Sequence, residues 1–254
     1  MLAQPNSGNG IIQMNKLTVN KLTGSQMVEQ ALQCLEEADT FTAIEFLNQQ
    51  PEPPVVAEAY NDLVKALYWQ IRDISQVVAM SRAGIQYCSD QAQKAAPSDM
   101  ASAYELRSAA KQLAYNLASY TWPGWNEEDI ELEPLQVEAG LDAARQNLRL
   151  ALELDKGDLP LSRAYWMLAG HLLAANALTG AEANYRRAAM YANRAGEVVD
   201  NLLAQAFADL AHWMGKPQEN GRRHNYDRAR EALAALEDGQ AFQEQLDSAR
   251  KVFM

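Results

Sequence analysis

Apolar positions recur every three or four residues from Ser25 to the C-terminus, and almost no segment alternates apolar with polar residues. The first spacing places apolar side chains on one face of an α-helix, whereas alternation is typical of a β-strand. Pro, Gly and Asn interrupt the pattern and mark helix ends. The sequence therefore predicts an all-α fold. We expect helices over residues 25–37, 40–50, 55–72, 74–95, 98–120, 135–155, 160–177, 179–194, 197–214, 223–237 and 239–252.

Two segments lack this helical period. Residues 1–24 are polar and Gly-rich and contain a short duplication, which predicts a flexible N-terminal tail before a helical repeat domain over 25–254. Residues 121–134, TWPGWNEEDIELEP, form the one long irregular stretch inside that domain. Its two tryptophans either fold back to fill a gap between helices, or they project with the acidic residues as an arm that grips a partner.

The segment 164–194 contains two helices with large and small residues at fixed spacings. In the first helix these residues are Tyr165, Leu168, Ala169 and Leu172, and in the second they are Ala181, Tyr185 and Ala188. Residues at these spacings form one stripe of a helix, and the small residues let two antiparallel helices approach closely. The segment resembles a tetratricopeptide repeat over about one full repeat.

Weaker copies of the pattern extend from residue 25 to 237. First-helix positions fall at Tyr60, Ala110, Tyr165 and Phe207, which are 50, 55 and 42 residues apart, whereas the family period is about 34. The resemblance implies a right-handed superhelical array of about five antiparallel helix pairs with a C-terminal capping helix. The alternative is a general helical bundle that contains one repeat-like hairpin.

The resemblance also implies a function, because the first helices of such arrays line a concave groove that binds a peptide or helix of a partner. Carried over by position, the groove residues are Asn61, Lys65, Trp69, Lys111, Tyr115, Arg163, Trp166 and His212. Trp166 is the expected anchor. Some members of the family clamp a terminal carboxylate, but Tyr115 and Met167 stand where that clamp needs Asn and a basic residue. We therefore expect a protein–protein interaction scaffold that binds a different kind of ligand.

The amino-acid composition indicates which classes of partner the chain can bind. The chain has 33 acidic and 22 basic residues and a net charge of −11, which disfavours binding to nucleic acid or to an anionic membrane. It has two cysteines, no apolar stretch of membrane-spanning length and no N-terminal basic segment before an apolar run. These features predict a cytoplasmic protein. Basic residues are most concentrated at Arg222, Arg223 and His224. This segment forms either a solvated turn or a contact for an anion.

Candidate chemistry is sparse. Asp209 and His212 share a helix face, and Ser108 and Lys111 have the spacing of a Ser-x-x-Lys motif without its partner motifs. Three histidines and two scattered cysteines predict no metal site and no cofactor. Two other functions remain open. The chain could be the peptide- or ligand-sensing domain of a bacterial regulatory system, or an all-helical enzyme with a His/Asp/Arg site.

Overall fold

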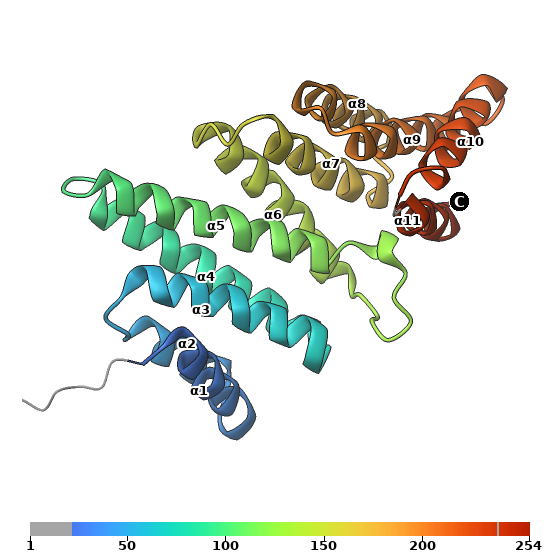
Figure 1. The fold of residues 1–254 in the computed structure, drawn as a ribbon. Coiled ribbons are helices and arrows are strands. Elements are labelled where there is room, and N and C mark those ends of the chain that lie inside the picture. The colour runs from blue at the N-terminus through green and yellow to red at the C-terminus, as the bar shows by residue number, and fades with distance from the viewer. Residues whose placement is uncertain (1–21, 238) are drawn as a thin grey trace, which may run out of the picture.

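The computed structural model describes residues 22–237 and 239–254, and every regular element within them is helical (Figure 1). The predicted all-α fold is confirmed. None of the helices in this part of the chain is long and apolar enough to cross a bilayer. The elements are α1 (Gly24–Glu37), α2 (Thr40–Asn48), α3 (Pro53–Ala66), the π-helical turn η1 (Leu67–Ile71), α4 (Ile74–Ala95), α5 (Met100–Tyr120), the 3-10 turn η2 (Pro123–Trp125), α6 (Pro134–Glu153), α7 (Asp158–Ala174), α8 (Leu178–Ala195), α9 (Val198–Gly215), α10 (Asn220–Ala234) and α11 (Gly239–Phe253).

The first helix begins at Gly24, one residue before its predicted start. Residues 1–21 of the predicted tail lie outside the described residues. Gly24 already belongs to α1, and Thr23 is its N-cap, because the Thr23 side chain accepts a hydrogen bond from the backbone N–H of Gln26 at 3.3 Å. The Gln26 side chain in turn accepts from the Thr23 N–H at 2.9 Å. This reciprocal pair satisfies two backbone donors at the start of the helix.

Aspartates begin three further helices. The carboxylates of Asp39, Asp73 and Asp99 each accept a hydrogen bond from the backbone N–H three residues later, at 2.7, 2.9 and 3.0 Å. A capping carboxylate satisfies one of the free N–H groups of the first turn and interacts favourably with the positive end of the helix dipole. The starts of α2, α4 and α5 are therefore set by local sequence.

Left-handed residues end α6 and α7 in the same way. Asp155 has φ 47° and Asn176 has φ 56°. The next residue in each case, Lys156 or Ala177, donates its backbone N–H to a carbonyl five positions earlier, at 3.2 and 2.8 Å. This pattern is the Schellman ending of a helix. It turns the chain sharply into the following helix and so produces antiparallel neighbours.

Each helix packs against the next, and the helix pairs follow one another from the N-terminal to the C-terminal end (Figure 1). Here α3, α5, α7 and α9 are called the first helices of their pairs. They also contact one another in order, α3 with α5, α5 with α7 and α7 with α9. The first helices thus form a continuous layer of the molecule.

The repeat-like hairpin of α7 and α8 packs through small residues. Ala169, Ala181 and Ala188 are fully buried, and Tyr185 fills the space beside them with no exposed surface. Leu168, which the repeat pattern places in the core, packs against the core but remains partly exposed. The small residues and Tyr185 therefore make the close helix contact that the sequence pattern predicts.

The irregular segment 121–134 folds onto the helices, as the first of its two interpretations predicts. Trp122 is 1% exposed and Trp125 is half-buried. The last helix, α11, packs against η2, α9 and α10, and the Ser248 hydroxyl donates to the Trp125 carbonyl at 3.2 Å. α11 therefore reaches back to the inserted segment as well as following α10.

Candidate functional site

One face of helix α5, here called the α5 stripe, lies between two hollows and is exposed at Glu105 and Gln112. Glu105, Ser108, Gln112 and Tyr115 succeed one another at intervals of three or four residues, so they lie on one face of the helix. Glu105 and Gln112 line a hollow toward α3, and Tyr115 lines a hollow toward α7. Both hollows therefore open beside the same face of the first-helix layer.

The hollow between α3 and α5 has a volume of about 360 Å³ and contains two of the predicted groove residues, Asn61 and Lys65. Asn61 is buried, and its side-chain oxygen accepts from the Asn116 amide of α5 at 3.2 Å. Lys65 is exposed and pairs with Asp62 at 2.9 Å. Asn61 thus joins the two helices under the hollow, while Lys65 lies at its edge with its charge already compensated.

The second hollow, of about 230 Å³, lies among α5, α7, α9, η2 and α11. Three predicted groove residues meet here, namely Tyr115, Arg163 and Trp166. The Arg163 Nε donates to an Asp200 oxygen at 3.1 Å, and this hydrogen bond raises the pKa of Arg163. Burial raises the pKa of Tyr115. Phe242 of α11 also lines this hollow.

Trp166 forms part of the aromatic core under the second hollow. Its ring centroid lies 5.2 Å from those of Trp122 and Phe207 and 6.0 Å from that of Tyr185. The side chain is only 9% exposed. The sequence predicted Trp166 as a free anchor for a partner, but little of its ring can be reached. A large residue at a helix-stripe position packs inward when neighbouring elements offer aromatic partners.

Lys111 and Trp69 lie apart from the two hollows. The Lys111 ammonium lies 5.7 Å from the Tyr115 ring centroid. Trp69 belongs to the π-helical turn at the end of α3, where it is 58% exposed and packs edge-on against Tyr68 and Tyr120. The predicted 55–72 helix therefore ends in an altered geometry that turns Trp69 toward solvent.

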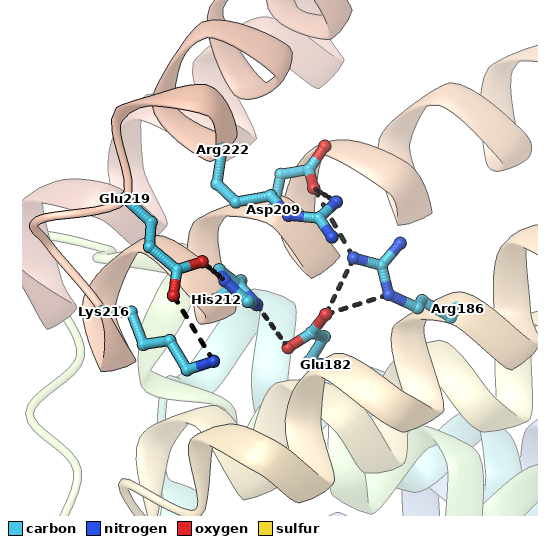
Figure 2. Close-up of polar contacts among 7 residues, drawn as sticks. All are labelled: Glu182, Arg186, Asp209, His212, Lys216, Glu219 and Arg222. Carbon is cyan, nitrogen blue, oxygen red and sulfur yellow. Dashed lines mark hydrogen bonds and ion pairs between the residues drawn. The ribbon is translucent and has the colours of Figure 1, made fainter.

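His212, the last predicted groove residue, faces α8 and the turn after α9. Its Nδ1 lies 2.9 Å from a Glu182 oxygen and its Nε2 lies 2.8 Å from a Glu219 oxygen (Figure 2). These two carboxylates, Glu219 foremost, raise the pKa of His212. The side chains that α9 contributes to the second hollow are instead Asp200 and Leu203.

The rest of this polar cluster joins α8, α9 and α10. Glu182 also accepts from Arg186 at 2.7 Å, and Lys216 lies 3.5 Å from Glu219 (Figure 2). Asp209 accepts from Arg222 at 3.0 Å and lies 3.7 Å from Arg186. Acidic and basic groups alternate through the cluster, so its ion pairs connect the three helices. The seven residues are here called the polar joint, namely Glu182, Arg186, Asp209, His212, Lys216, Glu219 and Arg222.

The predicted anion contact at residues 222–224 is largely occupied by the protein itself. These residues lie in the first turns of α10, which begins at Asn220 and not at residue 223 as expected. Arg222 pairs with Asp209, and Arg223 lies over the Trp213 ring, 5.4 Å from its centroid, and 4.0 Å from Asp227. His224 is exposed. Arg222 is therefore unable to serve a ligand without losing its partner.

Asp209 and His212, which the sequence places on one helix face, bind different partners. Asp209 binds arginines, whereas His212 binds glutamates. His171 is buried, and burial lowers its pKa to about 4, so it is neutral near pH 7 and its Nε2 donates to the Ala118 carbonyl at 2.8 Å. Within the described residues, no group of three or more His, Cys, Asp or Glu could hold a metal ion.

Sequence reasoning missed Asp200 and Phe242, which line the second hollow, and Asn116, which donates to Asn61 under the first hollow. Asn116 interrupts the apolar stretch 113–118 and Asp200 follows Val198 and Val199, and a polar residue beside apolar ones is a usable signal for a polar contact between elements. Phe242 gave no such signal, because its position depends on where α11 docks. No protein-family model and no curated protein matches the chain. Any functional assignment therefore depends on this geometry.

Proposed function

We propose that the protein is a non-catalytic scaffold whose helix pairs form a right-handed superhelical array of the tetratricopeptide type. In this proposal, a peptide or helix of a partner protein lies along the α5 stripe. The observation that supports it best is the pair of hollows on either side of that stripe. Five residues that the repeat resemblance assigns to a groove line them, namely Asn61, Lys65, Tyr115, Arg163 and Trp166.

The chemistry of the hollows favours apolar side chains of the partner. Ala57, Leu106 and Ala109 contribute to the first hollow, and Trp125, Trp166, Leu203 and Phe242 contribute to the second. The basic groups at their edges are compensated, Lys65 by Asp62 and Arg163 by Asp200. Partner segments of this kind insert apolar anchors and use surrounding polar groups for orientation.

Site-specific crosslinking tests this proposal. A photoreactive phenylalanine analogue replaces Glu105, which is exposed beside the first hollow, and a matched probe replaces Met190, which is 49% exposed on α8. After irradiation in cells, the Glu105 probe is expected to give discrete adducts with a partner, and the Met190 probe is expected to give none of them. Equal labelling from the two positions, or no adduct from Glu105, would contradict the proposal.

A further inference from the structure

Another hollow, here called the third hollow, opens among α4, α5 and α6 and has a volume of about 400 Å³. Its α5 residues recur at intervals of three or four and share a helix face that differs from the α5 stripe, namely Met100, Ala103, Arg107 and Ala110. α4 and α6 are joined near their N-terminal ends, where the Gln136 amide donates to the Ser75 hydroxyl at 3.2 Å. The third hollow lies toward the C-terminal ends of both helices, and its lining is separate from the two hollows of the proposed groove.

The deepest part of the third hollow is apolar. The small side chains of Ala92 and Ala103 are buried and leave the space between the helices unfilled, and Leu150 is buried beside them. Met100 and Tyr104 also line the hollow but are exposed, Met100 to 72%. Methionine is unbranched and flexible and adapts to the shape of a bound apolar group. The third hollow can therefore bury an apolar side chain of a ligand.

Two arginines that line the third hollow share one carboxylate. Arg107 and Arg149 both pair with Glu153, which lines the hollow as well. The Arg149 Nε lies 3.8 Å from one Glu153 oxygen, and the Arg107 guanidinium donates to the other oxygen. One carboxylate compensates only one positive charge, so these three side chains keep a net positive charge. Each guanidinium has five N–H donors, and pairing with Glu153 leaves some of them for a second carboxylate.

Lys156 adds a further positive charge beside the third hollow. Its ammonium lies 4.3 Å from the ring centroid of Tyr104, which lines the hollow, and donates to the Ser108 hydroxyl at 2.6 Å. The cation–π attraction and the hydrogen bond hold the ammonium in this place. Lys156 makes no ion pair with another residue that the structure describes. Basic groups therefore outnumber acidic ones at this hollow, although the whole chain has a net charge of −11.

We propose that the third hollow is a docking site for a segment of a partner protein in which an apolar side chain is flanked by acidic residues. The apolar side chain enters the hollow, and a neighbouring carboxylate binds the planar guanidinium groups of Arg107 and Arg149. Charge complementarity favours this occupant over a neutral or a basic segment. The site goes beyond the scaffold proposal, because it lies on another face of α5 and does not depend on a partner in the groove.

Selection from a random peptide library displayed on phage tests the site, with the full chain immobilised. A parallel selection uses Gln93→Trp, which fills the third hollow from an exposed position on α4 and should keep the native melting temperature. Peptides that are enriched on the native protein and not on Gln93→Trp are expected to combine a large apolar residue with Asp or Glu beside it. If no such peptides are enriched, or if the enriched peptides lack acidic residues, the proposal is wrong.

The affinity of the most enriched peptide for charge variants tests the basic edge of the hollow. Arg149→Gln removes a charge that lines the hollow, and Arg145→Gln removes the charge of an exposed arginine one turn earlier on α6 as the matched control. Arg149→Gln is expected to weaken binding about threefold, and Arg145→Gln should leave it unchanged. Gln112→Trp, which blocks the α5 stripe, should also leave it unchanged. Equal affinity for Arg149→Gln and the native protein, or a loss in Gln112→Trp, would overturn the assignment.

Sedimentation velocity of the native protein and of Gln93→Trp distinguishes a partner segment from a second copy of this chain. The same oligomeric state is expected in both, which leaves the third hollow open to a partner. A native dimer that Gln93→Trp dissociates would assign the hollow to a second copy and would contradict the proposal.

Discussion

Trp122 lies edge-on against Trp166, with their ring centroids 5.2 Å apart, and this contact joins the inserted segment 121–134 to α7. Trp122 also contacts Phe253 of α11, at 6.2 Å between centroids. One buried side chain therefore connects three parts of the chain that are distant in sequence. The second hollow rests on this aromatic cluster, so its shape depends on Trp122.

Trp122→Ala is expected to lower the free energy of unfolding by about 3–5 kcal/mol, because it removes a large side chain that is 1% exposed. Trp69→Ala is the matched control, since Trp69 is 58% exposed, and it should cost no more than about 1 kcal/mol. Urea unfolding of the two variants gives the comparison. Similar losses in both would show that the inserted segment is not packed as described.

Two glycines in helices should respond oppositely to alanine. At Gly140 an added Cβ would lie 2.1 Å from the Thr121 hydroxyl and 2.3 Å from the His171 ring, whereas at Gly180 its nearest neighbour is Leu172 at 3.5 Å. Gly140→Ala is expected to destabilise the protein by about 1–3 kcal/mol through overpacking. Gly180→Ala should be neutral or stabilising by up to about 1 kcal/mol, because alanine favours the helix. Melting temperatures that rise in both variants would contradict the close approach of α6 and α7.

Two buried tyrosines should respond differently to loss of their hydroxyl groups. The Tyr185 hydroxyl makes no hydrogen bond within the described residues, and the Tyr60 hydroxyl donates to the Asn48 side chain at 2.9 Å. Tyr185→Phe is expected to stabilise the protein by about 1 kcal/mol, since it removes a buried polar group that has no partner. Tyr60→Phe should cost about 0.5–1.5 kcal/mol. Chemical denaturation measures both, and a cost for Tyr185→Phe equal to that for Tyr60→Phe would refute the assignment.

The polar joint around His212 should contribute less to the free energy of unfolding as the pH rises. Glu219 and Glu182 raise the pKa of His212 above its ordinary 6.5, while the nearby Arg222 opposes the shift. Protonated His212 therefore stabilises the folded state fully below pH 6.5, and this stabilisation is lost as the pH rises through the raised pKa. Arg186 and Lys216 also pair with these two glutamates, Arg186 with Glu182 and Lys216 with Glu219.

The corresponding measurement is the free energy of unfolding at pH 6 and pH 8.5. His212→Gln is expected to remove most of the difference between the two values. His224→Gln, at an exposed position on α10, should leave the difference unchanged. If the free energy of unfolding falls by the same amount in the native protein and in His212→Gln between these pH values, His212 does not stabilise the polar joint.

Local sequence predicted the helices well because their ends are local features. Asp39, Asp73 and Asp99 cap helices through neighbouring backbone groups, and Asp155 and Asn176 end helices in the left-handed region. The π-helical turn at the end of α3 left no mark in the apolar pattern. The docking of α11 was also beyond prediction, because it depends on the surface that Trp122 and Trp125 create after the other helices have assembled.

Five of the eight predicted groove residues line the two hollows, and His212 shows why another does not. A helix turns about 100° per residue, so two residues twelve positions apart differ by about a third of a turn. Asp200 faces the second hollow, and His212 therefore lies on a different face of α9, toward α8. Asn61, Lys65, Tyr115 and Arg163 lie at helix positions that face the hollows, and all four line them.

The most direct test of the scaffold proposal is the affinity of the crosslinked partner for a protein whose groove is blocked. Gln112→Trp places a bulky ring at an exposed position on the α5 stripe, and Ala183→Trp places the same ring at an exposed position on α8. Both variants should keep the native melting temperature. The scaffold account predicts that Gln112→Trp weakens binding at least tenfold and that Ala183→Trp leaves it unchanged. Equal affinity of the two variants, measured by calorimetric titration, would contradict it.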